Sequence, residues 1–171
     1  MLLDVGDLSR ATGNEKEFAG SESRLEIELR GDRFVFRDVQ VQGWAKNVGG
    51  KIYIKGNIDT NADLNCSCCL TPFTISVASS FEETYYATAS VKEGDLDDTG
   101  RIYSGEQIDL RDVIIESLVL ALPMKPVCHP DCKGLCPSCG CNLNKDRCGC
   151  SPQEPDPRLA ALGEILKNMN D

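Results

Sequence analysis

Ten cysteines, gathered in two clusters, constrain the fold of this 171-residue chain more than any other feature. Three lie between Cys66 and Cys69, and seven lie between Cys128 and Cys150. Cysteines repeated at intervals of two to four residues have the spacing of metal ligands. The N-terminus lacks the basic and apolar regions of a secretory signal, so we expect a cytoplasmic protein whose thiols stay reduced. The clusters therefore predict metal binding rather than disulfides.

The C-terminal cluster contains a zinc knuckle, Cys136-Pro137-Ser138-Cys139-Gly140. Thiolates three positions apart can bind one ion when the loop turns tightly, and glycine after the second cysteine supplies the open backbone that this turn needs. Structural zinc takes four ligands, and an iron–sulfur cluster is the competing interpretation of a cysteine-rich loop. The spacing leaves open which cysteines bind. We predict one structural Zn²⁺ held by four of these six, in order of preference: Cys136, Cys139, Cys132, Cys148, Cys150 and Cys128.

A second pair with the same spacing, Cys66 and Cys69, lies at the end of a predicted strand. A redox-active pair would open a helix, whose dipole lowers the thiol pKa. Thr71-Pro72 and strand-like alternation follow instead, and this disfavours thiol-redox catalysis. Two interpretations stay open: the pair is half of a second metal site completed by another pair, or its thiols belong to the core.

Residues 25–88 alternate between apolar and polar side chains, the pattern of antiparallel strands with one buried face. Five or six such strands predict a sandwich or small barrel. Residues 52–66 alternate over a longer stretch than one ordinary strand occupies. This length predicts a bulge or bend near Gly56-Asn57 or Asn61.

An apolar segment at 109–122 predicts a helix that packs on this sheet, with Asp109 as its N-cap and Pro123 at its end. Asp156-Pro157 predicts the start of a short last helix. The expected fold is α+β. Its predicted domains are a β-rich domain with the packing helix at 1–122, and a zinc module with the short helix at 123–171.

The chain is acidic, with a net charge of −9 and a pI near 4.7. An excess of negative charge opposes nonspecific nucleic-acid binding, which needs Lys and Arg to neutralise phosphate. It suits a basic partner, such as a ribosomal protein. Lys133, Lys145 and Arg147 nevertheless make the zinc segment locally basic, and they are the candidate RNA contacts. The acidic run at 93–98 is expected to be an exposed loop.

The sequence contains few features that are typical of an enzyme or a membrane protein. His129 is the only histidine, and Pro130 follows it, so we expect it to be exposed rather than a ligand. There is no phosphate-binding glycine loop, no G-x-S-x-G motif and no run of eighteen apolar residues. We therefore expect neither an enzyme, nor a membrane association, nor a small-molecule substrate.

Four motifs follow one another along nearly the whole chain: Cys66-x-x-Cys69-Leu70-x-Pro72-Phe73; Ile108-Asp109-Leu110…Glu116…Leu120-Ala121-Leu122-Pro123; Cys132-Lys133-Gly134-Leu135-Cys136-Pro137-x-Cys139-Gly140-x-Asn142-Leu143-Asn144…Cys148-x-Cys150; and Asp156-Pro157-Arg158-Leu159-Ala160-Ala161-Leu162. Together they resemble the YceD family, the large ribosomal RNA subunit accumulation proteins. Cys68 departs from the family pattern, which usually has Arg at this position. If that Arg binds RNA in the family, this chain lacks the interaction.

The resemblance implies a non-catalytic factor in large ribosomal subunit biogenesis that supports accumulation or processing of large-subunit rRNA. The implied partner is a large-subunit rRNA precursor or a basic ribosomal protein. Two alternatives compete with it. One is a zinc-stabilised protein-binding adaptor without RNA contact, and the other is a thiol-redox enzyme that uses Cys66 and Cys69.

Overall fold

The computed structural model describes residues 1–29, 31–88 and 100–150. Contacts divide the chain into two compact units. The acidic run at 93–98 and the expected helix from Asp156 lie outside the described residues. We call the first unit the β unit, Met1–Asn65 with Pro72–Pro126, and the second the cysteine unit, Cys66–Thr71 with the chain from Val127 onward.

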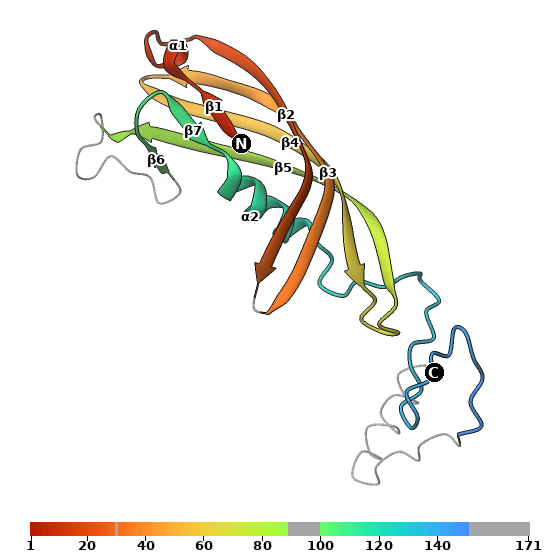
Figure 1. Cartoon of the computed structure of the whole chain (residues 1–171). Helices are drawn as coiled ribbons and strands as arrows, with labels where there is room; N and C mark the ends of the chain where they lie inside the picture. The colour runs from red at the N-terminus through yellow and green to blue at the C-terminus, as the bar shows by residue number, and fades with distance from the viewer. Residues whose placement is uncertain (30, 89–99, 151–171) are drawn as a thin grey trace, which may run out of the picture. The chain divides into compact units, whose positions relative to one another are not determined.

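The β unit is built on one curled sheet with the strand order β2-β3-β4-β5-β6 (Figure 1). Its first four strands form an antiparallel meander, and β6 pairs in parallel with β5. Gly49 and Gly50, which join β3 to β4, both have positive φ, as the tightest hairpin turns require. The strands are β2 Glu15–Leu29, β3 Asp32–Val48, β4 Lys51–Asn65, β5 Pro72–Ala87 and β6 Arg101–Tyr103.

The sequence predicts a bulge or bend in β4 near Gly56-Asn57 or Asn61, but the bulge lies in the neighbouring strand β3. Pairing of β4 with β5 is continuous, whereas β3 has one extra residue between Arg37 and Gln40, opposite Thr60. Asp38 takes a φ of 53° there, and the Thr60 hydroxyl donates to the Arg37 carbonyl at 2.8 Å. An extra residue bends and twists a strand locally. The bulge therefore lets four strands of 15 to 17 residues curve around one core.

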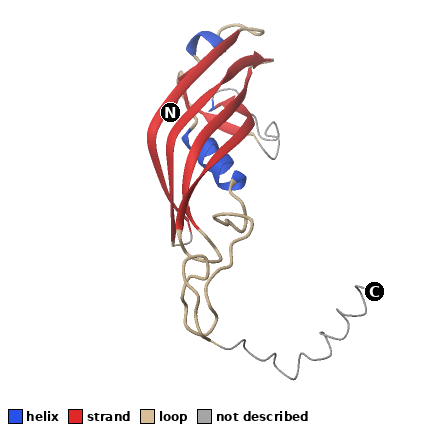
Figure 2. Ribbon diagram, turned by 90° about the vertical axis from the view of Figure 1, so that its right-hand side faces the viewer, coloured by secondary structure: helices blue, strands red, loops and turns tan. Residues whose placement is uncertain are grey.

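A row of two glycines between two aromatic rings crosses the sheet. Phe18 pairs with Gly43, Gly43 with Gly56, and Gly56 with Phe81. A Cβ atom at Gly43 would lie 2.1 Å from the Lys55 carbonyl oxygen, and one at Gly56 would lie 2.5 Å from the Phe81 ring. The missing side chains let the strands bend, and the rings cover the bare backbone. The result is the half-barrel curvature seen in Figure 2.

Helix α2, Arg111–Ala121, packs on the concave side of this sheet (Figure 2). Val113, Ile114 and Leu118 are its buried residues, and they join the core formed by the inward side chains of the strands. This combination of an antiparallel sheet and a packing helix confirms the predicted α+β class. Neither α2 nor any other described helix is long and apolar enough to cross a membrane.

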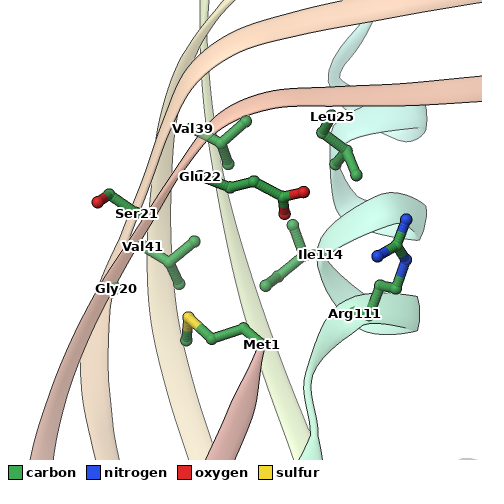
Figure 3. Close-up of a pocket in the computed structure, with 9 residues that line it drawn as sticks. All are labelled: Met1, Gly20, Ser21, Glu22, Leu25, Val39, Val41, Arg111 and Ile114. Atoms are coloured by element: carbon green, nitrogen blue, oxygen red, sulfur yellow. The ribbon is translucent and has the colours of Figure 1, made fainter.

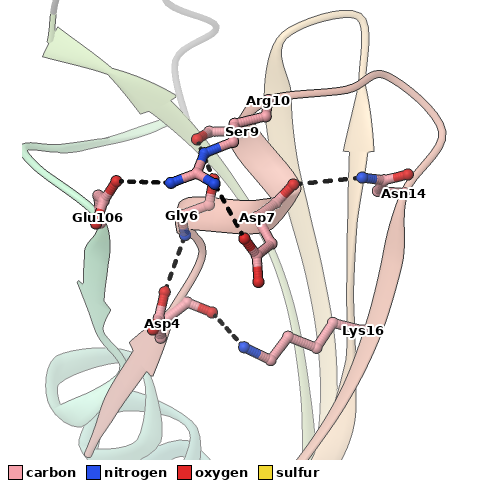
Figure 4. Close-up of polar contacts among 8 residues, drawn as sticks. All are labelled: Asp4, Gly6, Asp7, Ser9, Arg10, Asn14, Lys16 and Glu106. Carbon is pink, nitrogen blue, oxygen red and sulfur yellow. Dashed lines mark hydrogen bonds and ion pairs between the residues drawn. The ribbon is translucent and has the colours of Figure 1, made fainter.

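Two short strands, β1 Leu2–Asp4 and β7 Gln107–Asp109, pair with each other, and β7 leads into α2. Because Asp109 closes β7, the helix begins at Arg111, but the Asp109 carboxylate still accepts the Arg111 N–H at 2.9 Å. A single helical turn, α1 Gly6–Ser9, follows β1. Polar contacts hold this corner (Figure 4); Asp4, for example, accepts the Gly6 N–H at 2.9 Å.

Candidate metal centres

The first centre consists of Cys66, Cys69, Cys128 and Cys132, whose Sγ atoms all lie within 4.8 Å of one another. Sγ of Cys66 is 3.7 Å from that of Cys132, and Sγ of Cys69 is 3.7 Å from that of Cys128. A tetrahedral zinc centre with bonds of about 2.3 Å holds its sulfurs about 3.8 Å apart, whereas a disulfide joins them at about 2.05 Å. The spacing is therefore that of four ligands around one ion.

The second centre consists of Cys136, Cys139, Cys141 and Cys148, whose Sγ atoms also lie within 4.8 Å of one another. A fifth thiol, that of Cys150, is within hydrogen-bonding reach of Cys139 and then Cys136, and these contacts raise its pKa to about 12. Five thiols thus surround a centre that needs four for tetrahedral coordination.

Each centre contains a knuckle with the same main-chain hydrogen bonds. In the knuckle at 66–71, the Leu70 N–H donates to the carbonyl of the first cysteine at 2.9 Å, and the N–H of that cysteine donates five residues onward at 3.0 Å. In the knuckle at 136–141 the corresponding distances are 2.9 and 2.8 Å. The residue after the second cysteine has positive φ in both, 58° at Leu70 and 73° at Gly140. Leucine therefore occupies a turn that is usually reserved for glycine.

Main-chain N–H groups favour the thiolate form of Cys66 and of Cys136. The Thr71 side chain and then its N–H lower the pKa of Cys69. Burial opposes ionisation of Cys66, but three N–H groups, led by that of Cys128, lower its pKa to about 6. The N–H of Cys139 is the largest cause that lowers the pKa of Cys136 to about 6. Burial and then neighbouring thiols raise the pKa of Cys128, and likewise of Cys141, to about 12. Crowded thiolates repel one another, so a divalent cation would stabilise each centre strongly.

Further hydrogen bonds join the two centres within the cysteine unit. The Leu135 N–H donates to the Cys68 carbonyl at 3.1 Å. Gly134 has positive φ, and a Cβ atom there would lie 3.1 Å from that carbonyl oxygen. The Asn144 side-chain amide donates to the sulfur of Cys132 at 3.4 Å. Hydrogen bonds to ligands orient them, and losing one typically lowers metal affinity by roughly 10–100-fold.

The three predicted RNA contacts, Lys133, Lys145 and Arg147, are exposed. None of them takes part in an ion pair within the part of the chain that the structure describes. Asp131 and Asp146, their neighbours in sequence, are exposed as well. Up to Cys150, where the described residues end, the cysteine unit therefore presents three basic and two acidic side chains apart from its thiols.

A model of one protein family, described as "Large ribosomal RNA subunit accumulation protein YceD", matches residues 54–166. The chain belongs to the YceD family. The match begins within β4 and includes all ten cysteines, so the resemblance based on the four motifs is confirmed.

Among YceD relatives with curated sequences, an uncharacterized protein of Mycobacterium tuberculosis is 32% identical over 177 residues, which cover 100% of this chain and 84% of that protein. "Large ribosomal RNA subunit accumulation protein YCED homolog 1, chloroplastic" of Arabidopsis thaliana is 34% identical over 64 residues, 37% of this chain and 20% of that protein. Its counterpart in Zea mays is 35% identical over 71 residues, 39% and 24% of the two chains. No solved structure matches the chain.

In this YceD chain the six predicted ligands are divided between the two centres. Cys128 and Cys132 lie with the Cys66 and Cys69 pair, while Cys136, Cys139 and Cys148 lie together and Cys150 lies beside them. Cys141 is absent from the predicted set but belongs to the second centre. Knuckle spacing alone does not mark Cys141 as a ligand, because the equivalent position of the first knuckle is Thr71.

Proposed function

We propose that this YceD protein is a non-catalytic factor in large ribosomal subunit biogenesis that supports accumulation or processing of large-subunit rRNA. Membership of a family described by that activity, over residues 54–166, carries the proposal. The arrangement of thiols supports the non-catalytic part. Centres with four cysteines each are coordinatively closed, whereas a catalytic zinc keeps one position open for water or substrate.

Both centres, in this proposal, hold structural Zn²⁺. The two knuckles and the sulfur spacing of 3.7 Å in the first centre fit tetrahedral zinc. Cys141 completes the second centre, and Cys150 stays outside the coordination shell. The protein would then bind two ions, one more than a count of knuckle motifs in the C-terminal cluster predicts.

Native mass spectrometry with elemental analysis tests the metal content. The wild-type chain should carry two zinc ions, Cys141→Ser about one, and the matched variant Cys150→Ser two. Equal loss in the two variants would show that the coordination shell is assigned wrongly. Detection of iron together with a visible charge-transfer absorbance would show that the thiols hold an iron–sulfur cluster rather than zinc.

The cysteine unit, rigid once metal is bound, would place Lys133, Lys145 and Arg147 against rRNA phosphate. Their charge acts against an opposing field, because a Zn²⁺ with four thiolates carries a net charge of about −2, and two centres about −4. Phosphate contact must therefore be local, made by side chains that extend away from the thiolates. We expect only a shallow dependence of binding on salt, consistent with two or three phosphate contacts at most.

Replacing all three basic residues with Ser tests this interaction. Co-sedimentation with large-subunit precursors should weaken at low salt, and the dependence of affinity on salt should flatten by roughly one unit of slope for each phosphate that is no longer neutralised. Zinc content must stay unchanged in the variant. Unchanged association would instead support the adaptor alternative, in which a basic ribosomal protein is the partner and RNA is not touched.

The thiol-redox alternative requires that Cys66 and Cys69 be reactive. Cys66 and Cys69 lie in a group with two other thiols, so they can react only after the metal leaves. Thiol titration of the metal-loaded protein should find neither of them reactive on the timescale of a redox enzyme.

A further inference from the structure

The half-barrel has an open edge at β2. Among the described residues, β2 is hydrogen-bonded to β3 on one side and to no strand on the other. Within the same described ranges, no main-chain hydrogen bond from outside this ladder reaches residues 17–29. An exposed strand of this length presents a row of main-chain donors and acceptors to any extended segment that lies beside it.

An apolar pocket lies between this edge and helix α2 (Figure 3). Its volume is about 250 Å³, below the range of roughly 300–1,000 Å³ that suits drug-sized ligands and cofactors. Glu22 of β2 points across it toward α2, from which Arg111 also contributes to its wall. The size suits one or two inserted side chains. The apolar side chains that line it are Met1, Leu25, Val39, Val41 and Ile114.

The charges along β2 are mostly acidic, because five glutamates outnumber Lys16 and Arg24, and Arg24 is paired with Glu26. Glu17, Glu22 and Glu28 are exposed and take part in none of the ion pairs among the described residues. Glu17 pairs with Trp44, on the convex face, and Glu22 pairs with buried Val39, on the concave face. A second copy of this chain is a poor occupant, because pairing β2 with β2 would bring these carboxylates together.

We propose that β2 is a docking edge for an extended basic segment of a protein partner, which adds to the half-barrel as a further antiparallel or parallel strand. The chemistry of the edge sets the pattern of that segment. Side chains on its concave side are apolar and enter the pocket beside Ile114, and those on its convex side are Lys or Arg and face Glu17 and Glu28. Strand addition of this kind takes affinity from main-chain hydrogen bonds and specificity from alternate side chains. The inference stands on the β unit alone and does not rest on the proposed role of the cysteine unit.

The probe is a synthetic peptide of about fourteen alternating lysine and valine residues, long enough to lie beside both Glu17 and Glu28. Its controls are the same peptide with glutamate in place of lysine, and a form methylated on alternate main-chain nitrogens. Fluorescence anisotropy with the full chain should show binding of the lysine peptide only. Amide exchange should slow at alternate residues within 17–22 and again within 24–29 when it binds, because the inward side of β2 changes from even to odd positions between Glu22 and Leu25. Amides along the outer side of β2 that are already protected in the free chain would overturn the proposal, because the edge would then be covered.

Two matched variants distinguish the effect of charge at the β2 edge on peptide binding from the effect of the net charge of the protein. Glu17→Lys should weaken binding by roughly tenfold, because it places like charges opposite one another, whereas Asp59→Lys on central strand β4 makes the same change in net charge and should act within about twofold. Both positions are exposed, so neither change should unfold the β unit. Equal weakening by the two variants, or binding that survives main-chain methylation, would overturn the proposal.

Discussion

The two units of this protein are stabilised by different means. The β unit buries a continuous apolar core in which Phe36, Ile52 and Leu118 are fully inaccessible. In the described part of the cysteine unit the buried side chains are those of Cys66, Cys69 and Cys136. The β unit is therefore stabilised by an apolar core, and the interior of the described part of the cysteine unit consists of thiols. We infer that the first folds without metal and that the second depends on it.

Removal of the metal should have the largest effect, and it should act on the cysteine unit alone. Metal binding supplies on the order of 10 kcal/mol of folding free energy in small structural zinc modules, and the described part of the cysteine unit has no apolar core to replace it. After chelation under reducing conditions, NMR signals of residues 127–150 should collapse to unfolded positions. The strand signals of β2 to β5 should remain.

The control for this experiment is return of zinc, which should restore the original signals. Disappearance of the strand signals on chelation would show that the β unit also depends on the metal, and the division into two independently folding units would be wrong.

Truncation of a core side chain should destabilise the β unit and leave metal binding by the cysteine unit unchanged. Leu118→Ala, on the buried side of α2, should destabilise the β unit by about 2–5 kcal/mol through reduced burial and a cavity. Leu120→Ala is its matched control, since Leu120 is 85% exposed on the same helix and should change stability by less than about 0.5 kcal/mol. Denaturant unfolding followed at Trp44, which lies in β3, measures both. A fall in zinc content of folded Leu118→Ala would contradict the independence of the two units.

The fold class followed from the sequence because alternation and an apolar helix are local signals. The bulge was misplaced although its signal is also local. The side chains of β3 that pack in the core are partly buried Phe34 and buried Phe36, two apart, and then Val39 and Val41, so the step is three between Phe36 and Val39. That change of parity places the extra residue in β3 rather than β4. The helix start was two residues early because strand pairing of Asp109 outweighs its capping tendency.

The grouping of cysteines could not be deduced in the same way. Cys69 and Cys128 are 59 residues apart, and only the β4–β5 hairpin and the path of the chain after α2 bring them together. Spacing identifies a knuckle but not which other pair completes its centre. The open edge of β2 could not be predicted from the sequence either, because the position of a strand in a sheet depends on how all the strands pair.

The smallest predicted effect compares the two knuckles directly. Leu70 takes φ of 58° and is 65% exposed, so its side chain contributes little burial while its backbone is strained. A left-handed conformation costs about 1–2 kcal/mol for an L-residue, and glycine loses more backbone freedom on folding by roughly 0.5–1 kcal/mol. Leu70→Gly should therefore strengthen the first centre by about 0.5–1 kcal/mol.

Gly140→Leu is the matched reverse change at the equivalent position of the second knuckle. A Cβ atom at Gly140 would meet no described atom within 4 Å, so strain at φ of 73° is the main consequence, and the second centre should weaken by a similar amount. Competition with a chelator of known affinity should show shifts of about two- to fivefold in zinc affinity, in opposite directions for the two variants. A weaker first centre in Leu70→Gly would mean that the leucine side chain makes interactions that outweigh its strained backbone. Leu70 would then be a structural part of the cysteine unit rather than a tolerated departure from glycine.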